Sequence, residues 1–126
     1  MRNTLIAIII FSSLLGFVYY ANYTLLNLCE DVITGSEEIE VLIQEGNFEE
    51  AHKNSTILME LIEENGLLTS VYIDHNDFDN LQDEALQLSI YTSCSDTTES
   101  LISVGTLKNS ALNLINLHKT SIRNIF

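Results

Sequence analysis

Hydrophobic positions follow two different patterns along the chain. Residues 5–20 read LIAIIIFSSLLGFVYY, and no charged residue lies between Arg2 and Glu30. From about residue 25 onward, apolar residues instead recur every three or four positions, which is the spacing of amphipathic helices, and no strand alternation appears. The two patterns predict an all-α protein in which an N-terminal transmembrane helix is followed by a small antiparallel helical bundle.

The apolar run is long enough to cross a membrane. About 20 apolar residues rising 1.5 Å each span a ~30 Å hydrocarbon core, and Tyr19, Tyr20 and Tyr23 suit the interfacial region at its far end. We expect residues 1–4 to form a cytoplasmic tail, residues 5–26 a transmembrane anchor and residues 27–126 an extracytoplasmic acidic bundle. The orientation rests on Arg2 and the free amino terminus, because positively charged flanks stay in the cytoplasm.

Two other interpretations of the apolar run are weaker. A cleaved signal peptide needs small residues at both key positions of its cleavage site, whereas Ala21 is preceded two residues earlier by Tyr19. A lipoprotein signal needs a small residue directly before its cysteine, whereas Leu28 precedes Cys29. An uncleaved signal-anchor is therefore the favoured prediction.

Four helical segments follow from the spacing of apolar residues and from capping residues. The first spans about residues 25–45 and either continues the membrane helix or restarts near Gly35. The second follows its cap Asn47 and ends at Asn65-Gly66. The third runs from its cap Asn76 to Ser93, and residues 67–75 connect it to the second. The fourth opens with the capping-box spacing of residues 96–99. The apolar stripes consist of Leu28, Val32, Ile39, Leu42 and Ile43; Phe48, Ala51, Ser55, Leu58 and Ile62; Phe78, Leu81, Ala85 and Leu88; and Leu101, Val104, Leu107, Ala111, Leu114, Ile115, His118 and Ile122.

Short connections make successive helices antiparallel, which predicts an up-down-up-down order. Cys29 then lies at the membrane end of its helix and Cys94 at the distal end of the bundle. About 15 residues of helix, or roughly 20–25 Å, separate them. A disulfide requires less than about 7 Å between α-carbons, so we expect two free thiols.

Charge narrows the possible partners. The formal net charge is −13, and residues 27–95 hold 16 acidic residues with Lys53 as their only base. Nucleic acid is an unsuitable partner because phosphate binding needs clustered Lys and Arg. The acidic residues are expected to form solvated helix faces. Residues 74–79 fail as a calcium loop, because Phe78 takes a ligand position and Ala85 stands where a Glu is required.

The layout resembles a known family. The N-terminal spanning helix, the acidic segment Asn47-Phe-Glu-Glu-Ala, the run from Ile73-Asp74-His75 to Leu81 and the terminal Arg123-Asn-Ile-Phe are similar to domain-of-unknown-function family 4363. The resemblance implies a short membrane-anchored protein of Firmicutes with a helical extracytoplasmic domain. It supplies no activity. Tryptophans common in that family are replaced here by Phe48 and by other residues.

Three histidines are the candidate metal-binding residues, and the alternative for each is a purely structural role. His75 lies at the start of the third segment, where a buried imidazole needs a partner such as Asp79. His118 and His52 lie on or beside the stripes of other helices, but His52 belongs at the opposite end of the bundle. A two-histidine site completed by Asp74 or Glu63 competes with a structural role for His75.

No sequence feature predicts an enzyme. Gly-x-Ser-x-Gly turns and phosphate-binding loops are absent, so no catalytic, cofactor-binding or metal-ligating residue is assigned. We expect a non-enzymatic, single-pass protein that contacts another membrane or envelope protein from outside a bacterial cytoplasmic membrane. The alternative is a sensor or metal-binding or ligand-binding module that acts through a membrane partner.

Overall fold

The computed structural model describes the backbone of residues 1–66 and 75–125 and the side chains of residues 1–66 and 76–117. Four helices make up nearly all of this part of the chain: α1 (Arg2–Gln44), α2 (Phe48–Glu64), α4 (His75–Ser93) and α5 (Thr97–Ile125). No strand occurs among the described residues. The all-α prediction is confirmed.

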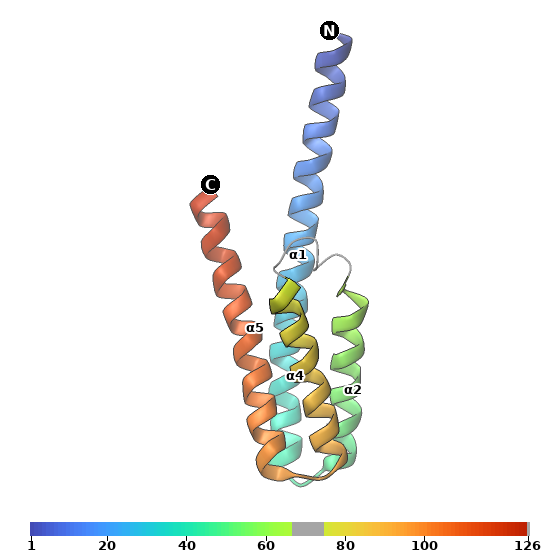
Figure 1. Cartoon of the computed structure of the whole chain (residues 1–126), viewed down its shortest axis with the longest axis vertical. Helices are drawn as coiled ribbons and strands as arrows, with labels where there is room; N and C mark the ends of the chain where they lie inside the picture. The colour runs from blue at the N-terminus through green and yellow to red at the C-terminus, as the bar shows by residue number, and fades with distance from the viewer. Residues whose placement is uncertain (67–74, 126) are drawn as a thin grey trace.

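The helices form an antiparallel four-helix bundle. Each helix packs against two neighbours, in the order α1, α2, α4, α5 and back to α1. The α1–α2 and α4–α5 turns lie together at one end, and the N-terminal half of α1 projects from the other end (Figure 1). This arrangement confirms the up-down-up-down order.

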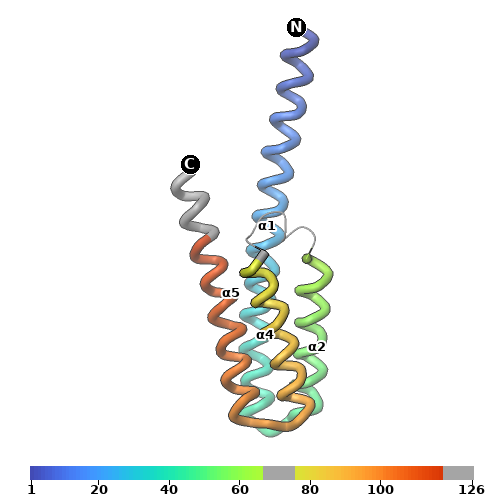
Figure 2. Tube along the Cα trace, in the orientation of Figure 1, coloured from blue at the N-terminus to red at the C-terminus, as the bar shows by residue number. Residues whose placement is uncertain are grey.

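Helix α1 is one continuous helix of 43 residues (Figure 2). Its first half is exposed, whereas from Ala21 onward one face enters the bundle. The restart considered near Gly35 does not occur. Instead α1 approaches α2 closely there, because a Cβ atom on Gly35 would lie 2.8 Å from Leu58 Cδ2. The missing side chain at residue 35 therefore makes room for a core leucine.

The core consists of the stripes expected from the sequence. Because residues three and four apart share one face of a helix, each helix buries one such row. Buried members are Leu28, Val32, Ile39 and Ile43; Ala51, Leu58 and Ile62; Phe78, Leu81, Ala85 and Leu88; and Val104, Leu107, Ala111, Leu114 and Ile115. The side chains of His118 and Ile122 lie outside the described residues.

The turn between α1 and α2 satisfies the free backbone groups at both helix ends. Gly46 has a φ of +78°. Its N–H donates to the Ile43 carbonyl at 3.0 Å, and the Asn47 N–H donates to the Leu42 carbonyl at 2.9 Å, which is a Schellman motif. Asn47 Oδ1 then accepts from the Glu50 N–H at 3.4 Å, which confirms the predicted cap of α2.

The turn between α4 and α5 repeats this geometry with other residues. Ser95 has a φ of 55°. Its N–H donates to the Thr92 carbonyl, and the Asp96 N–H donates to the Tyr91 carbonyl, both at 3.2 Å. Asp96 Oδ1 caps α5 by accepting from the Glu99 N–H at 3.1 Å. Only this half of the predicted capping box is seen, because the Asp96 N–H already donates to the end of α4.

Two further predictions concern single residues. The prediction that Asn76 caps α4 is wrong, because α4 already begins at His75 and Asn76 lies within its first turn. Both cysteines are free thiols: Cys29 is buried in α1, and Cys94 is exposed at the end of α4. The antiparallel order from which their separation was predicted is the order observed.

Candidate functional site

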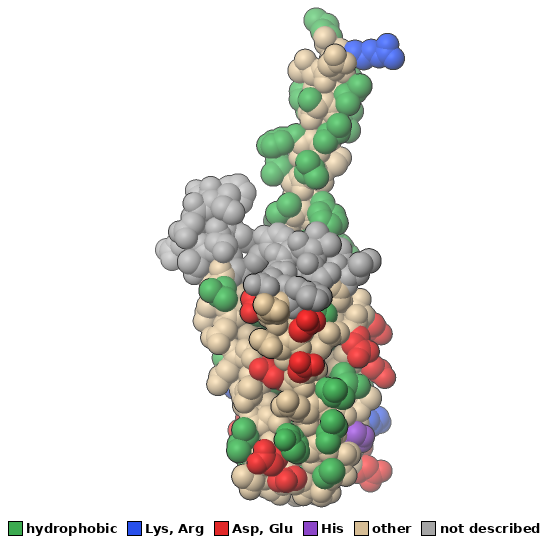
Figure 3. Space-filling model, in the orientation of Figure 1, with side chains coloured by type: hydrophobic (Ala, Val, Ile, Leu, Met, Phe, Trp, Pro, Cys, Tyr) green, Lys and Arg blue, Asp and Glu red, His purple; other side chains and the backbone are tan. Residues whose placement is uncertain are grey.

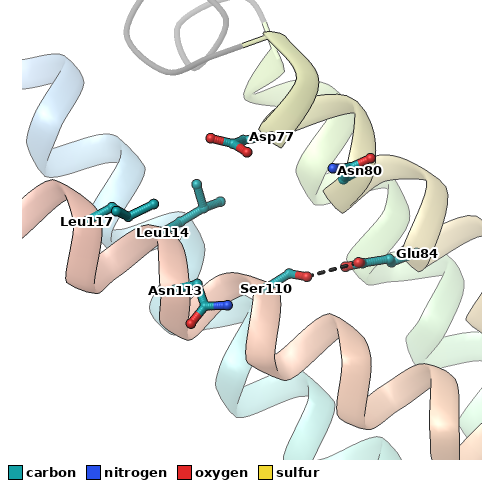
Figure 4. A pocket seen from close by; sticks show the side chains of 7 residues that line it. All are labelled: Asp77, Asn80, Glu84, Ser110, Asn113, Leu114 and Leu117. Atoms are coloured by element: carbon teal, nitrogen blue, oxygen red, sulfur yellow. Dashed lines mark hydrogen bonds between the residues drawn. The ribbon is translucent and has the colours of Figure 1, made fainter.

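A groove between α4 and α5 is the candidate site in the described part of the bundle. A cavity of about 220 Å³ lies between the two helices, lined by Asp77, Asn80, Glu84, Ser110, Asn113, Leu114 and Leu117 (Figure 4). A second cavity of about 90 Å³ lies nearer the distal turn, lined by Glu84, Gln87, Tyr91, Glu99, Ile102, Ser103 and Thr106. Glu84 lines both cavities, so the two form one groove, which we call the α4–α5 groove.

Helical periodicity explains why polar side chains line this groove. On α4 the core row includes Ala85, and Glu84 is its immediate neighbour in sequence, about 100° around the helix axis. On α5 the core row includes Ala111, and Ser110 precedes it in the same way. The flanking positions of the two helices face each other, which places the carboxylate of one helix against the hydroxyl of the other (Figure 4).

Glu84 is the central residue of the α4–α5 groove. Ser110 Oγ donates to Glu84 Oε1 at 2.9 Å. Glu84 Oε2 is buried without a hydrogen-bond partner. Burial raises the pKa of Glu84, the nearby Asp83 carboxylate raises it further, and the hydrogen bond from Ser110 opposes both. The result is a half-satisfied carboxylate that favours an incoming donor or positive charge.

The lining of the groove determines its chemistry. Three carboxylates line it, from Asp77, Glu84 and Glu99, and none of the described lining residues is basic. Ile102 and Leu117 lie toward its two ends and are 57% and 62% exposed. Within the described residues, no three His, Cys, Asp or Glu side chains are close enough together to hold a metal ion. The arrangement suits a ligand with a positive charge at its centre and apolar groups at its ends.

The projecting half of α1 carries no acidic residue, since the first acidic residue of the chain is Glu30. On the face shown in Figure 3, hydrophobic side chains lie along this projecting half, and the acidic side chains lie on the bundle. Among the described bases of the bundle, Lys108 pairs with Glu37 on α1, with Nζ 3.1 Å from Oε1. This pair ties α5 to α1, on the side of α5 away from the groove.

His52, which the sequence predicts to lie away from the other two histidines, has defined contacts in the structure. His52 Nδ1 lies 2.9 Å from the Ser89 carbonyl and 3.5 Å from Thr92 Oγ1, so it links α2 to α4. The sequence feature that could have indicated this contact is the position of His52 beside the buried Ala51, which places the imidazole at the edge of the core. The side chains of His75 and His118 lie outside the described residues, as does Asp74.

The rejected calcium loop has a clear local structure. Residues 75–79 belong to the first turns of α4 and therefore have helical backbone. A calcium loop needs an irregular backbone that wraps around the ion. Asp77 instead contributes to the α4–α5 groove.

These features define a class of protein: a four-helix bundle whose first helix extends into a long apolar segment. The chain belongs to the family described as a domain of unknown function, DUF4363, which matches residues 19–125. This match confirms the resemblance noted in the sequence. No curated protein and no solved structure matches the chain.

Proposed function

We propose that this protein is a single-pass, membrane-anchored interaction module that holds its acidic helical bundle outside a bacterial cytoplasmic membrane. In this proposal it is not an enzyme, and it acts by contacting another membrane or envelope protein. The observation that carries the proposal is the construction of α1. The same helix supplies an exposed apolar segment of membrane-spanning length and, further on, one side of the bundle core.

The exposure of the apolar segment supports insertion in a membrane. Only 6% of its most apolar stretch is buried inside the molecule. A core helix of a soluble protein would be mostly buried, so this segment needs another apolar environment. Its side chains are exposed on all faces from Leu5 to Tyr20, which is the pattern of a helix surrounded by lipid.

The residues around Ala21 support an anchor over a cleaved signal sequence. A cleavage site needs small residues at both key positions, whereas Tyr19 lies two residues before Ala21. We therefore propose that residues 5–26 remain attached and form the anchor.

The outward orientation is tested by labelling thiols in intact cells with a membrane-impermeant maleimide. Cys94 is exposed and serves as the reporter in a Cys29→Ser background. The matched control carries Asn3→Cys with both native cysteines replaced by serine. We expect Cys94 to react in intact cells and the Asn3→Cys variant to react only after permeabilisation. The opposite pattern would overturn the orientation, and an intact mass lacking the first 20 or so residues would overturn the anchor.

The alternative function, a metal-binding or ligand-binding sensor centred on His75, stays a prediction. Metal analysis of the full chain purified in detergent tests it, with His75→Ala as the matched variant. Stoichiometric metal in the wild-type chain that is lost in the variant would favour the sensor over the interaction module.

A further inference from the structure

We propose that the α4–α5 groove is the docking surface of this module and that its occupant is a cationic amphipathic helix of a partner protein, with a Lys or Arg side chain set against Glu84. This inference rests on the proposed interaction function and specifies the chemistry of the partner. It combines the shape of the groove, the position of its apolar ends and the charge of its lining.

The length of the groove matches a helix of about four turns. Ile102 and Leu117 are separated by fifteen residues of α5, which is ~22 Å at 1.5 Å per residue. Both are more than half exposed. Ser110, which donates to Glu84, lies midway between them. A partner helix of about four turns therefore reaches both apolar ends while its middle lies over the carboxylate.

The unmatched carboxylate at the centre explains why the partner carries a cation. Glu84 Oε2 is buried and lacks a hydrogen-bond donor in the described part of the chain. A buried acceptor without a donor is destabilising, and a charged donor gives the strongest compensation. An ammonium or guanidinium group in the 220 Å³ cavity places the opposite charge beside the Glu84 side chain, which lines that cavity.

Charge distinguishes this groove from the α1–α5 side of the bundle. Asp77 and Glu99 extend the negative potential toward its two ends. On the α1–α5 side, by contrast, Glu37 already has Lys108 as its partner. With a formal net charge of −13, the chain attracts basic partners by long-range steering, and the groove then selects among them by geometry.

The test uses a synthetic probe and the full chain in detergent micelles. The probe is a fluorescein-labelled, helix-forming peptide of about five turns, with one arginine at its centre and one leucine two turns to each side on the same face. Its matched control has glutamine in place of the arginine. Binding is measured by fluorescence anisotropy. We expect the arginine peptide to bind the wild-type chain at least about tenfold more tightly than the glutamine peptide.

Variants of the protein separate the groove from general acidity. Glu84→Gln is expected to remove most of the preference for arginine, a loss of about tenfold or more. Glu38→Gln removes the same charge from an exposed position on α1 and is expected to change binding less than about twofold. Ile102→Ala and Leu117→Ala act on exposed side chains, so they leave the core intact, and each is expected to weaken both peptides by about threefold to tenfold.

Each outcome bears on the groove alone. Equal losses in Glu84→Gln and Glu38→Gln would show a general electrostatic effect and overturn the docking surface, as would no binding of either peptide to the wild-type chain. Neither result alters thiol labelling at Cys94, which tests the anchored, outward-facing module independently. Failure of the labelling with retained peptide binding would overturn the proposed location and leave the groove in place.

Discussion

The two distal turns provide a matched pair of substitutions whose effects should have opposite signs. Both turns have the same hydrogen-bond pattern, and both place one residue in the left-handed region. In the first turn that residue is Gly46, with a φ of +78°, and in the second it is Ser95, with a φ of 55°. Glycine adopts this conformation readily, whereas a serine is strained in it. Ser95→Gly should therefore stabilise the bundle and Gly46→Ser should destabilise it.

The magnitude follows from two opposing terms. A residue with a Cβ atom loses about 1–2 kcal/mol in the left-handed region. Glycine carries a larger entropy in the unfolded chain, which offsets about 0.5–1 kcal/mol of that gain. The net stabilisation expected for Ser95→Gly is thus about 0.5–1 kcal/mol. Gly46→Ser should lose a similar amount, because no atom lies within 4 Å of the added Cβ and the effect is purely conformational.

Thermal unfolding of the full chain in detergent, followed by far-ultraviolet circular dichroism, measures both effects. For a bundle of this size, the expected free-energy change corresponds to a shift in Tm of about 2–8 °C, upward for Ser95→Gly and downward for Gly46→Ser. The double substitution should lie near the wild type, since the two turns are separate and share no partner. A lower Tm for Ser95→Gly would refute the reasoning, because it would mean that the serine at residue 95 is not strained.

Four other outcomes are expected. A maleimide should label Cys94 in the native chain but reach Cys29 only after unfolding, because Cys29 is buried. The same burial, with a smaller contribution from the Glu30 carboxylate, raises the pKa of the Cys29 thiol to about 12, which disfavours the reactive thiolate. Non-reducing mass spectrometry should show no bond between the two cysteines. His52→Ala should lower the free energy of unfolding by about 1–2 kcal/mol through loss of its link to α4, as measured by urea denaturation. Gly35→Ala should lower the Tm despite its better helix propensity, because the new Cβ overlaps a core leucine. Glu84→Gln should raise the Tm at pH values above the raised pKa of Glu84, where the carboxylate is ionised. This gain over wild type should shrink as the pH falls through that pKa, and a constant difference would contradict the assignment.

The core and the helix order were predictable because they depend on local patterns. Residues such as Ile39, Ala51 and Leu88 belong to rows spaced by three and four positions, and each row is buried. Asn47 and Asp96 were recognised as caps because Asn and Asp accept backbone hydrogen bonds well at such positions. These features are written in short stretches of sequence and need no knowledge of tertiary contacts.

Features that depend on neighbouring helices escaped sequence-based reasoning. Ser95 was not expected in the left-handed region, because serine has no preference for it and only the turn geometry requires it. Gly35 suggested a restart of the helix, whereas its role is to admit a leucine from α2. The partnership of Glu84 with Ser110 depends on the relative height of two helices, which no local pattern specifies.

Glu84 is an unfavourable residue for the stability of the bundle, so a purely structural role does not explain its position. A glutamine at this site would remove the charge, and an apolar residue would also remove the unsatisfied polar atom. The chain nonetheless places a carboxylate there, beside a second acidic residue at position 83 that raises its pKa further. In the docking that we propose, this group gains a partner of opposite charge from outside the chain, so the stability of the free chain and its affinity for that partner oppose each other. We therefore expect Glu84→Gln to separate the two properties, giving a more stable bundle that has lost its preference for a cationic helix.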